Sequence, residues 1–242
     1  MSALGHYLEE EGIATVAIAL IRPQAENTKP PRALWVPFEL GRPLGPPGDP
    51  AFQRRVVIAA LSLLELGGGP VVITDFAQDD PRAQPDPGWH APLTSPPVAA
   101  IPAPALASGL EAEVARLRAV HQRWVAQHAR STTGLSGLVI EDSAAYVADW
   151  LRGKAPPSPR AGFSAPLALR FAVDDLKAYC LEAAGAGAGK PSSRQLGDWF
   201  WKQTVTGAAL YRLRELLLVH EDERLRLIVS NFIVPAARLR PG

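Results

Sequence analysis

The sequence predicts an α+β protein, in which a small, incomplete α/β layer is followed by an all-α helical domain. Two short apolar segments typical of strands lie within the first 40 residues. Residues 77–107 are rich in proline and show almost no periodicity. From residue 108 onward, apolar side chains recur at helical spacing. We therefore expect an α/β fragment over 1–76, a proline-rich linker or surface-hugging segment over 77–107, and a helical domain over 108–242.

The α/β fragment is expected to begin with a helix and two strands. Residues 3–11 read as the end of a helix, with Gly12 as its C-terminal stop. The uninterrupted apolar run 13–21 predicts a strand buried on both faces. After a loop rich in proline and lysine, residues 33–38 predict a second strand, whose far end is weakened by Pro37. Strand, loop, strand, loop and helix in this order indicate a Rossmann-like fragment rather than a complete doubly wound domain.

The remaining elements are expected to be helices. Asp49 as N-cap and Pro50 in the first turn predict a helix that runs to Leu66. In the second half Ser108 and Ser193 are candidate N-caps. The helices predicted there cover residues 109–130, 142–151, 165–184, 192–204, 206–220 and 222–234. Together they predict an all-α bundle.

Composition excludes several classes of function. The formal net charge of +1 gives no electrostatic case for nucleic acid or anionic lipid as the main partner. The N-terminus shows no signal peptide, and the apolar run 13–21 is about half a membrane span, so we expect a cytoplasmic protein. Cys180 is the single cysteine, which excludes an internal disulfide and a multi-thiolate metal site. Its helical surroundings favour a buried structural thiol over a nucleophile.

The helical half contains several candidate sites, each with a structural alternative. His121 and His128 lie two helical turns apart on one face of a predicted helix. They could form a metal-ligand pair completed by carboxylates from another helix, or they could simply be side chains at the boundary between two helices. The turn 131–137 offers an anion cradle of backbone N–H groups or a simple polar turn. The aromatic run 198–201, near Arg194 and Lys202, is a stacking platform or bundle core. The acidic run 220–223 offers metal ligands or a solvated first helical turn. The sequence indicates no particular cofactor and no metal.

The loop after the second strand carries the substrate-binding prediction. Residues 41–50 contain four prolines and three glycines and run from the end of a strand into a helix N-terminus. In open α/β sheets, ligands bind outside the carboxyl ends of strands, and a helix N-terminus favours anions. We therefore predict that Arg42, Gly45 and Asp49 contribute to a site for a small carboxylate. The alternative is a stiff connector in which Arg42 is solvated.

This loop, together with residues 8–16, resembles the glycine/sarcosine/betaine/D-proline reductase family, in particular its selenoprotein component B. In that family a helix ending at a glycine leads into a buried strand, and a second strand leads into a proline-rich loop with a PLGxP core. Pro43-Leu44-Gly45-Pro46-Pro47 matches this core. The resemblance covers about residues 3–66, roughly a quarter of the chain. The helical remainder more weakly resembles uncharacterised members of the group.

The resemblance implies an oxidoreductase subunit that acts in reductive cleavage of C–N bonds in small amino-acid-like carboxylates. Family members carry a selenocysteine or cysteine just before the helix that corresponds to residues 3–11. This chain has Met1 there, so no catalytic residue carries over. We therefore expect a missing N-terminal half or a partner subunit to supply the thiol or selenol. The alternatives are a non-catalytic binding or assembly protein that self-associates, and a helical metalloprotein centred on His121 and His128.

Overall fold

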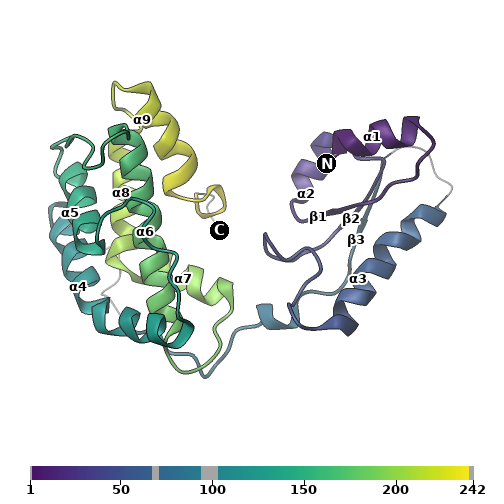
Figure 1. The fold of residues 1–242 in the computed structure, drawn as a ribbon, viewed down its shortest axis with the longest axis horizontal. Coiled ribbons are helices and arrows are strands. Elements are labelled where there is room, and N and C mark those ends of the chain that lie inside the picture. The colour runs from purple at the N-terminus through teal and green to yellow at the C-terminus, as the bar shows by residue number, and fades with distance from the viewer. Residues whose placement is uncertain (1, 67–70, 94–102, 240–242) are drawn as a thin grey trace. The chain divides into compact units, whose positions relative to one another are not determined.

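The structure, a computed structural model, describes residues 2–66, 71–93 and 103–239. The chain divides into two compact units, Met1–Gln84 and Pro85–Gly242 (Figure 1). The first is a small α/β unit and the second is helical, so the predicted α+β class is confirmed.

The α/β unit is built on a three-stranded parallel sheet. The strands follow one another in the order β1-β2-β3, with Ala17 opposite Ala33 and Ala33 opposite Ile73. Short helices connect them, as parallel strands require. The elements are α1 (Ser2–Glu10), β1 (Ala17–Ala19), α2 (Arg22–Thr28), β2 (Arg32–Trp35), α3 (Pro50–Ser62), a 3-10 turn (Leu63–Glu65), β3 (Val72–Asp75) and a second 3-10 turn (Pro81–Ala83).

The core of the α/β unit lies between the sheet and α3. Leu34 on β2 belongs to the same buried cluster as Val56 and Ala60 on α3. The rings of Phe38 and Phe52 lie 5.6 Å apart in a tilted arrangement, which is favourable for aromatic pairs. This packing fixes the segment between β2 and α3 at both of its ends.

Three expectations for this unit differ from the structure. The prediction of a strand over 13–21 that is buried on both faces is wrong. The strand β1 has only three residues, all of them partly buried, and Ile13 and Ile21 are exposed. The physical reason is twofold. In the described part of the chain β1 pairs only with β2, and the N–H of Thr15 bonds to the side chain of Glu9 instead of a neighbouring strand. The expected proline- and lysine-rich loop contains α2, and β3 was not expected as a strand.

The helical unit confirms the predicted bundle. Its elements are α4 (Ala103–His128), α5 (Ile140–Leu151), α6 (Ala165–Gly185), α7 (Ser193–Gln203), α8 (Val205–Leu217), α9 (Glu223–Ile228), a π turn (Val229–Ile233) and a 3-10 turn (Ala236–Arg238). The most buried element is α6, which packs against α4, α5, α7 and α9. The N-cap of α7 is Ser192 rather than Ser193, with a capping box completed by Gln195, and Ser108 lies inside α4 rather than at its start.

Part of the proline-rich segment belongs to the helical unit. We call residues 85–93 the strap. The indole N–H of Trp89 donates to the backbone carbonyl of Ala184 on α6 at 3.1 Å. The indole N–H of Trp199 on α7 donates to the carbonyl of Leu93 at 3.0 Å. The strap therefore follows the surface of the bundle, and residues 94–102 of the expected linker lie outside the described residues.

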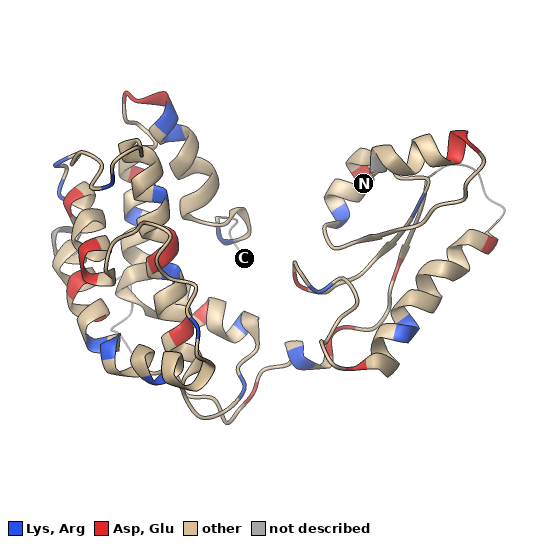
Figure 2. Ribbon diagram, viewed as in Figure 1, with Lys and Arg blue, Asp and Glu red and all other residues tan. Residues whose placement is uncertain are grey.

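Charged positions are scattered along the helices of the second unit, and in the α/β unit they include Arg54 and Arg55 in the middle of α3 (Figure 2). Within the described ranges, no helix combines the length and the apolar character needed to cross a bilayer.

Candidate functional site

The first candidate site is the β2–α3 loop, residues 39–49. It leaves the carboxyl end of β2 and leads into the first turn of α3. Gly45 adopts a φ of +83°, and a Cβ placed on it would lie 2.6 Å from the ring of Phe52. Only glycine combines this backbone conformation with so close an approach to a ring. Gly45 therefore holds the loop against α3.

Asp49 closes the loop as the N-cap of α3. Its side chain accepts a hydrogen bond from the backbone N–H of Phe52 at 2.9 Å, which confirms the predicted cap. The amide of Gln53 reaches back and donates to the carbonyl of Pro46 at 3.0 Å. Asp49 thus shapes the backbone of the loop, and its carboxylate is engaged in capping.

Arg42 is the cation that this loop presents at the surface. Its side chain is 44% exposed, and its nearest charged partner is Glu39 at 3.9 Å, beyond hydrogen-bond distance. The structure therefore places the three predicted residues in one loop with different roles. Gly45 and Asp49 fix the backbone, while Arg42 leaves its guanidinium open to solvent. Ligand binding there stays a prediction.

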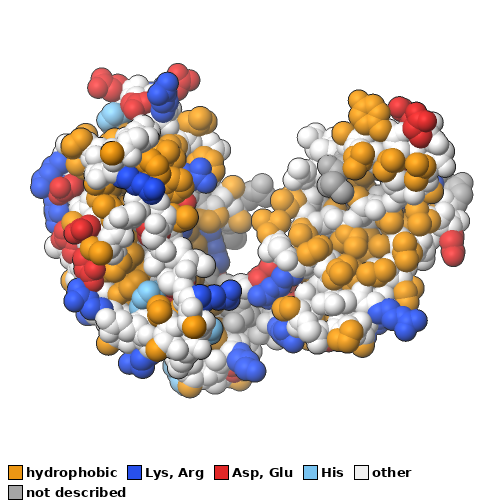
Figure 3. Space-filling view, in the orientation of Figure 1, with side chains coloured by type: hydrophobic (Ala, Val, Ile, Leu, Met, Phe, Trp, Pro, Cys, Tyr) orange, Lys and Arg blue, Asp and Glu red, His pale blue; other side chains and the backbone are white. Residues whose placement is uncertain are grey.

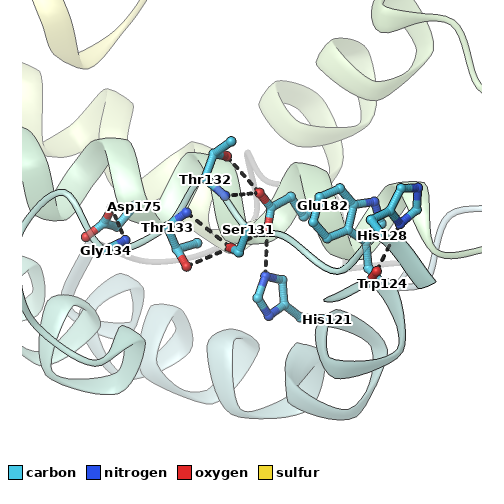
Figure 4. Close-up of polar contacts among 9 residues, drawn as sticks. All are labelled: His121, Trp124, His128, Ser131, Thr132, Thr133, Gly134, Asp175 and Glu182. Atoms are coloured by element: carbon cyan, nitrogen blue, oxygen red, sulfur yellow. Dashed lines mark hydrogen bonds and ion pairs between the residues drawn. The ribbon is translucent and has the colours of Figure 1, made fainter. Parts of the chain in front are cut away.

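The second candidate site lies in the helical unit, where two acidic residues of α6 hold the turn 131–137 (Figure 4). Asp175 accepts four hydrogen bonds, from the backbone N–H groups of Gly134, Leu135 and Ser136 and from the hydroxyl of Ser136. The four distances lie between 2.5 and 3.0 Å. Only 1% of Asp175 is exposed, so these bonds compensate the burial of its charge.

Glu182 lies two helical turns after Asp175 and binds the start of the same turn. It accepts the backbone N–H and the hydroxyl of Thr132 at 2.6 and 2.7 Å, and the hydroxyl of Ser131 at 2.7 Å. Burial acts to raise the pKa of Glu182, but hydrogen bonds from Thr132, Ser131 and His121 outweigh it and hold that pKa below its ordinary value of 4.5. Glu182 is therefore an ionised carboxylate at neutral pH.

These contacts distinguish between the two alternatives for the turn 131–137, an anion cradle and a simple polar turn. Backbone N–H groups of the turn do bind anions, but the anions are the carboxylates of Asp175 and Glu182 from the same chain. The structure therefore favours the polar-turn alternative over a cradle for an external anion. The sequence alone could not name these internal partners, because Asp175 and Glu182 lie about 40 to 50 residues beyond the turn.

His121 and His128 share one face of α4 but do not converge. The Nε2 of His121 is 2.8 Å from the carboxylate of Glu182, and its ring contacts that of Tyr179 at a centroid distance of 4.4 Å. The ring of His128 instead stacks on Trp124 at 4.3 Å, and its Nδ1 bonds to the Trp124 carbonyl. The described part of the chain contains no group of three His, Cys, Asp or Glu side chains able to hold a metal ion. The structure therefore gives the metalloprotein hypothesis no site.

A cavity of about 460 Å³ opens beside His121, between α4, the start of α5 and α6. Arg118, His121 and Gln122 line it from α4, and Glu141 lines it from α5. Arg118 pairs with Glu141 at 2.6 Å, and both side chains are well exposed. The sequence reasoning did not find this cavity. One signal was present: Asp175 and Glu182 lie on the otherwise apolar, buried face of α6.

The other candidates have structural roles. Cys180 is fully buried, and burial raises the pKa of its thiol well above the ordinary value, so it is not a nucleophile. In the aromatic run, Trp199 and Phe200 are each 1% exposed and form part of the bundle core. In the acidic run 220–223, Asp222 caps α9.

No protein-family model matches this sequence. No curated protein and no solved structure matches it either.

Proposed function

We propose that the chain is a component-B-like subunit of a glycine/sarcosine/betaine/D-proline reductase-type oxidoreductase, whose α/β unit binds a small amino-acid-like carboxylate. One observation carries the proposal. A proline-rich loop leaves the carboxyl end of β2 in a parallel sheet and runs directly into the capped N-terminus of α3. Ligands of open parallel sheets bind at this edge. The PLGPP core that resembles the reductases lies in this same loop, at residues 43–47.

Arg42 supplies the charge that such a ligand needs. Its planar guanidinium can bind a carboxylate through two parallel hydrogen bonds. The exposed contact with Glu39, at 3.9 Å, contributes little free energy, so a ligand carboxylate can replace it. The loop itself is held by Gly45 against Phe52 and by the Asp49 cap, which favours a preformed site.

The reductive step requires a thiol or selenol from outside the described chain. Attack on the substrate needs an accessible, ionisable sulfur or selenium. Cys180 is the single cysteine, and it is fully buried with a raised thiol pKa. We therefore assign the nucleophile to a partner subunit or to a polypeptide half that carries the family's selenocysteine or cysteine motif.

Calorimetric titration with glycine, sarcosine, betaine and D-proline tests the carboxylate site. A charge-assisted pair contributes about 1.5–3 kcal/mol, so Arg42→Ala should weaken binding by about ten- to a hundredfold. Arg42→Lys should recover little, because an ammonium lacks the bidentate geometry. The matched control is Arg54→Ala, at an exposed position of α3, and this variant should bind as the wild type does. Equal dissociation constants in all four proteins, or no binding by the wild type, would exclude the proposed site.

A second candidate function is that of a non-catalytic assembly protein. The α/β unit exposes apolar side chains over much of the face seen in Figure 3. Leu4, Tyr7, Ile13, Ile21 and Leu40 are each more than 40% exposed, and a groove of about 690 Å³ runs between α1, β1 and α2. Exposed apolar areas and edge strands are typical of association surfaces.

Sedimentation velocity over a hundredfold range of concentration tests self-association. Ile21→Asp, which places a charge beside β1, should shift an oligomer to monomer, whereas Val219→Asp, at an exposed position in the helical unit, should not. A wild-type chain that stays monomeric and folded at all concentrations would contradict self-association and leave a separate partner subunit as the assembly to seek.

A further inference from the structure

We propose that the cavity beside His121 is a second ligand site, which binds the zwitterion of a small α-amino acid. The site lies wholly within the helical unit and does not depend on Arg42 or on the β2–α3 loop. Its polar side chains come from one face of α4, from the first turn of α5, from the turn 131–137 and from α6.

Glu182 determines which nitrogen of His121 carries the proton. An ionised carboxylate only accepts hydrogen bonds, so the Nε2 that lies 2.8 Å from it must be the donor. In neutral His121 the Nδ1 then keeps its lone pair. Figure 4 shows the ring with Nε2 directed at Glu182 and the second nitrogen directed away from it. Because His121 lines the cavity, a ligand N–H group can donate to this nitrogen.

Arg118 and Glu141 provide the two charges that a zwitterion needs. Arg118 precedes His121 by three residues, so the two side chains lie on one helix face about 5–6 Å apart at Cβ. Arg118 and Glu141 pair with each other at 2.6 Å with 55% and 39% of their side chains exposed. Such an exposed pair contributes little net free energy, so a ligand can exchange into it. The ligand carboxylate then binds Arg118, and its ammonium lies between Nδ1 of His121 and Glu141.

The rest of the cavity selects for a small, partly apolar molecule. The ring of Tyr179 lines it, while the Tyr179 hydroxyl is occupied by the carbonyl of Val114 at 2.9 Å. Leu138 and Val139 line it as well and suit a short aliphatic side chain. Asp175 also borders the cavity, but its carboxylate already accepts four hydrogen bonds and does not compete for the ammonium.

Nitrogen-15 NMR of the histidine rings tests the proposal at the site itself. In the free protein His121 should show a protonated Nε2, whereas His128, whose Nδ1 donates to a carbonyl, should show the opposite tautomer. Titration with L-alanine should shift the Nδ1 signal of His121 and leave His128 unchanged. Betaine keeps both charges but has no N–H group, and acetate lacks the cation, so both should bind about tenfold more weakly or worse.

Substitutions assign the signal to this cavity. Arg118→Ala should weaken alanine binding by at least tenfold, and the exposed Arg116→Ala, two residues away on α4, should not. Arg42→Ala should leave the response of His121 intact, which separates this site from the reductase-type site. The proposal is overturned if alanine leaves the His121 signal unmoved, if betaine binds as tightly as alanine, or if Arg118→Ala and Arg116→Ala behave alike.

Discussion

Asp175→Asn should reduce the free energy of unfolding of the helical unit by about 3–5 kcal/mol. One carboxylate oxygen of Asp175 accepts from Gly134 and Leu135, and an amide oxygen can keep these two bonds. The other oxygen accepts the N–H and the hydroxyl of Ser136, and an NH₂ group in its place leaves that buried N–H facing a second donor. An unsatisfied buried donor costs about 1–3 kcal/mol, and loss of charge from the two retained bonds costs about 1 kcal/mol each.

Urea unfolding followed by tryptophan fluorescence measures this loss, because five of the six tryptophans lie in the helical unit. Asp174→Asn is the matched control. Its partly exposed carboxylate lies 3.4 Å from Lys177, and its loss should cost at most about 1 kcal/mol. Hydrogen exchange should also accelerate at the N–H of Ser136 in the Asp175 variant, because this group loses its acceptor. If the two variants unfold at the same urea concentration, the four-bond account of Asp175 is refuted.

Three further predictions concern single residues in both units. Gly45→Ala should destabilise the α/β unit by about 1–3 kcal/mol in thermal unfolding, because the new methyl group meets the ring of Phe52 at a left-handed backbone position; an unchanged melting temperature would contradict this. Glu182 has a pKa lowered by folding, so its contribution to stability is complete above pH 4.5 and is lost as the pH falls below that value; Glu182→Gln should flatten the acid limb of a stability–pH curve. Cys180 should react with a thiol reagent only as fast as the protein unfolds, because the thiol is fully buried and its pKa is raised. Rapid labelling of the native protein would show that the thiol is accessible and would contradict this prediction.

The elements that sequence reasoning predicted are those with local signals. The helices of the second half follow the apolar period, and the helix that begins at Pro50 follows from an aspartate before a proline. The aromatic core position of Trp199 and Phe200 follows from the same period. In each case neighbouring residues in the chain determine the structure.

The elements that it missed depend on contacts distant in the chain. The apolar run 13–21 is typical of an interior strand, but Glu9 takes the N–H of Thr15, and β1 shortens to three residues. The helix α2 lies in a segment with three prolines among residues 22–32, yet Pro23 in its first turn is compatible with a helix start. Parallel pairing of β3 with β2 joins residues about 40 positions apart, which no local pattern reveals.

The same limit applies to the candidate sites. The residues of the β2–α3 loop could be predicted as one site because they are consecutive in the sequence. The partner of His121 could not be predicted, because Glu182 lies 61 residues away. Asp175 and Glu182 lie on the buried face of a predicted helix, so each needs hydrogen-bond partners. The identity of these partners becomes known only from the fold, which brings the donors of the turn 131–137 to them.

The strap changes where the helical unit can be separated from the rest of the chain. Asp86 exchanges two hydrogen bonds with the side chain of Gln195, and its carboxylate accepts the N–H of Lys190. These bonds, with those of Trp89 and Leu93, close the side of the bundle formed by α6 and α7. A fragment that starts at residue 108 would expose this side and leave the indole N–H of Trp199 without its acceptor. An independently folding helical fragment should therefore begin no later than Pro85, well ahead of its first long helix.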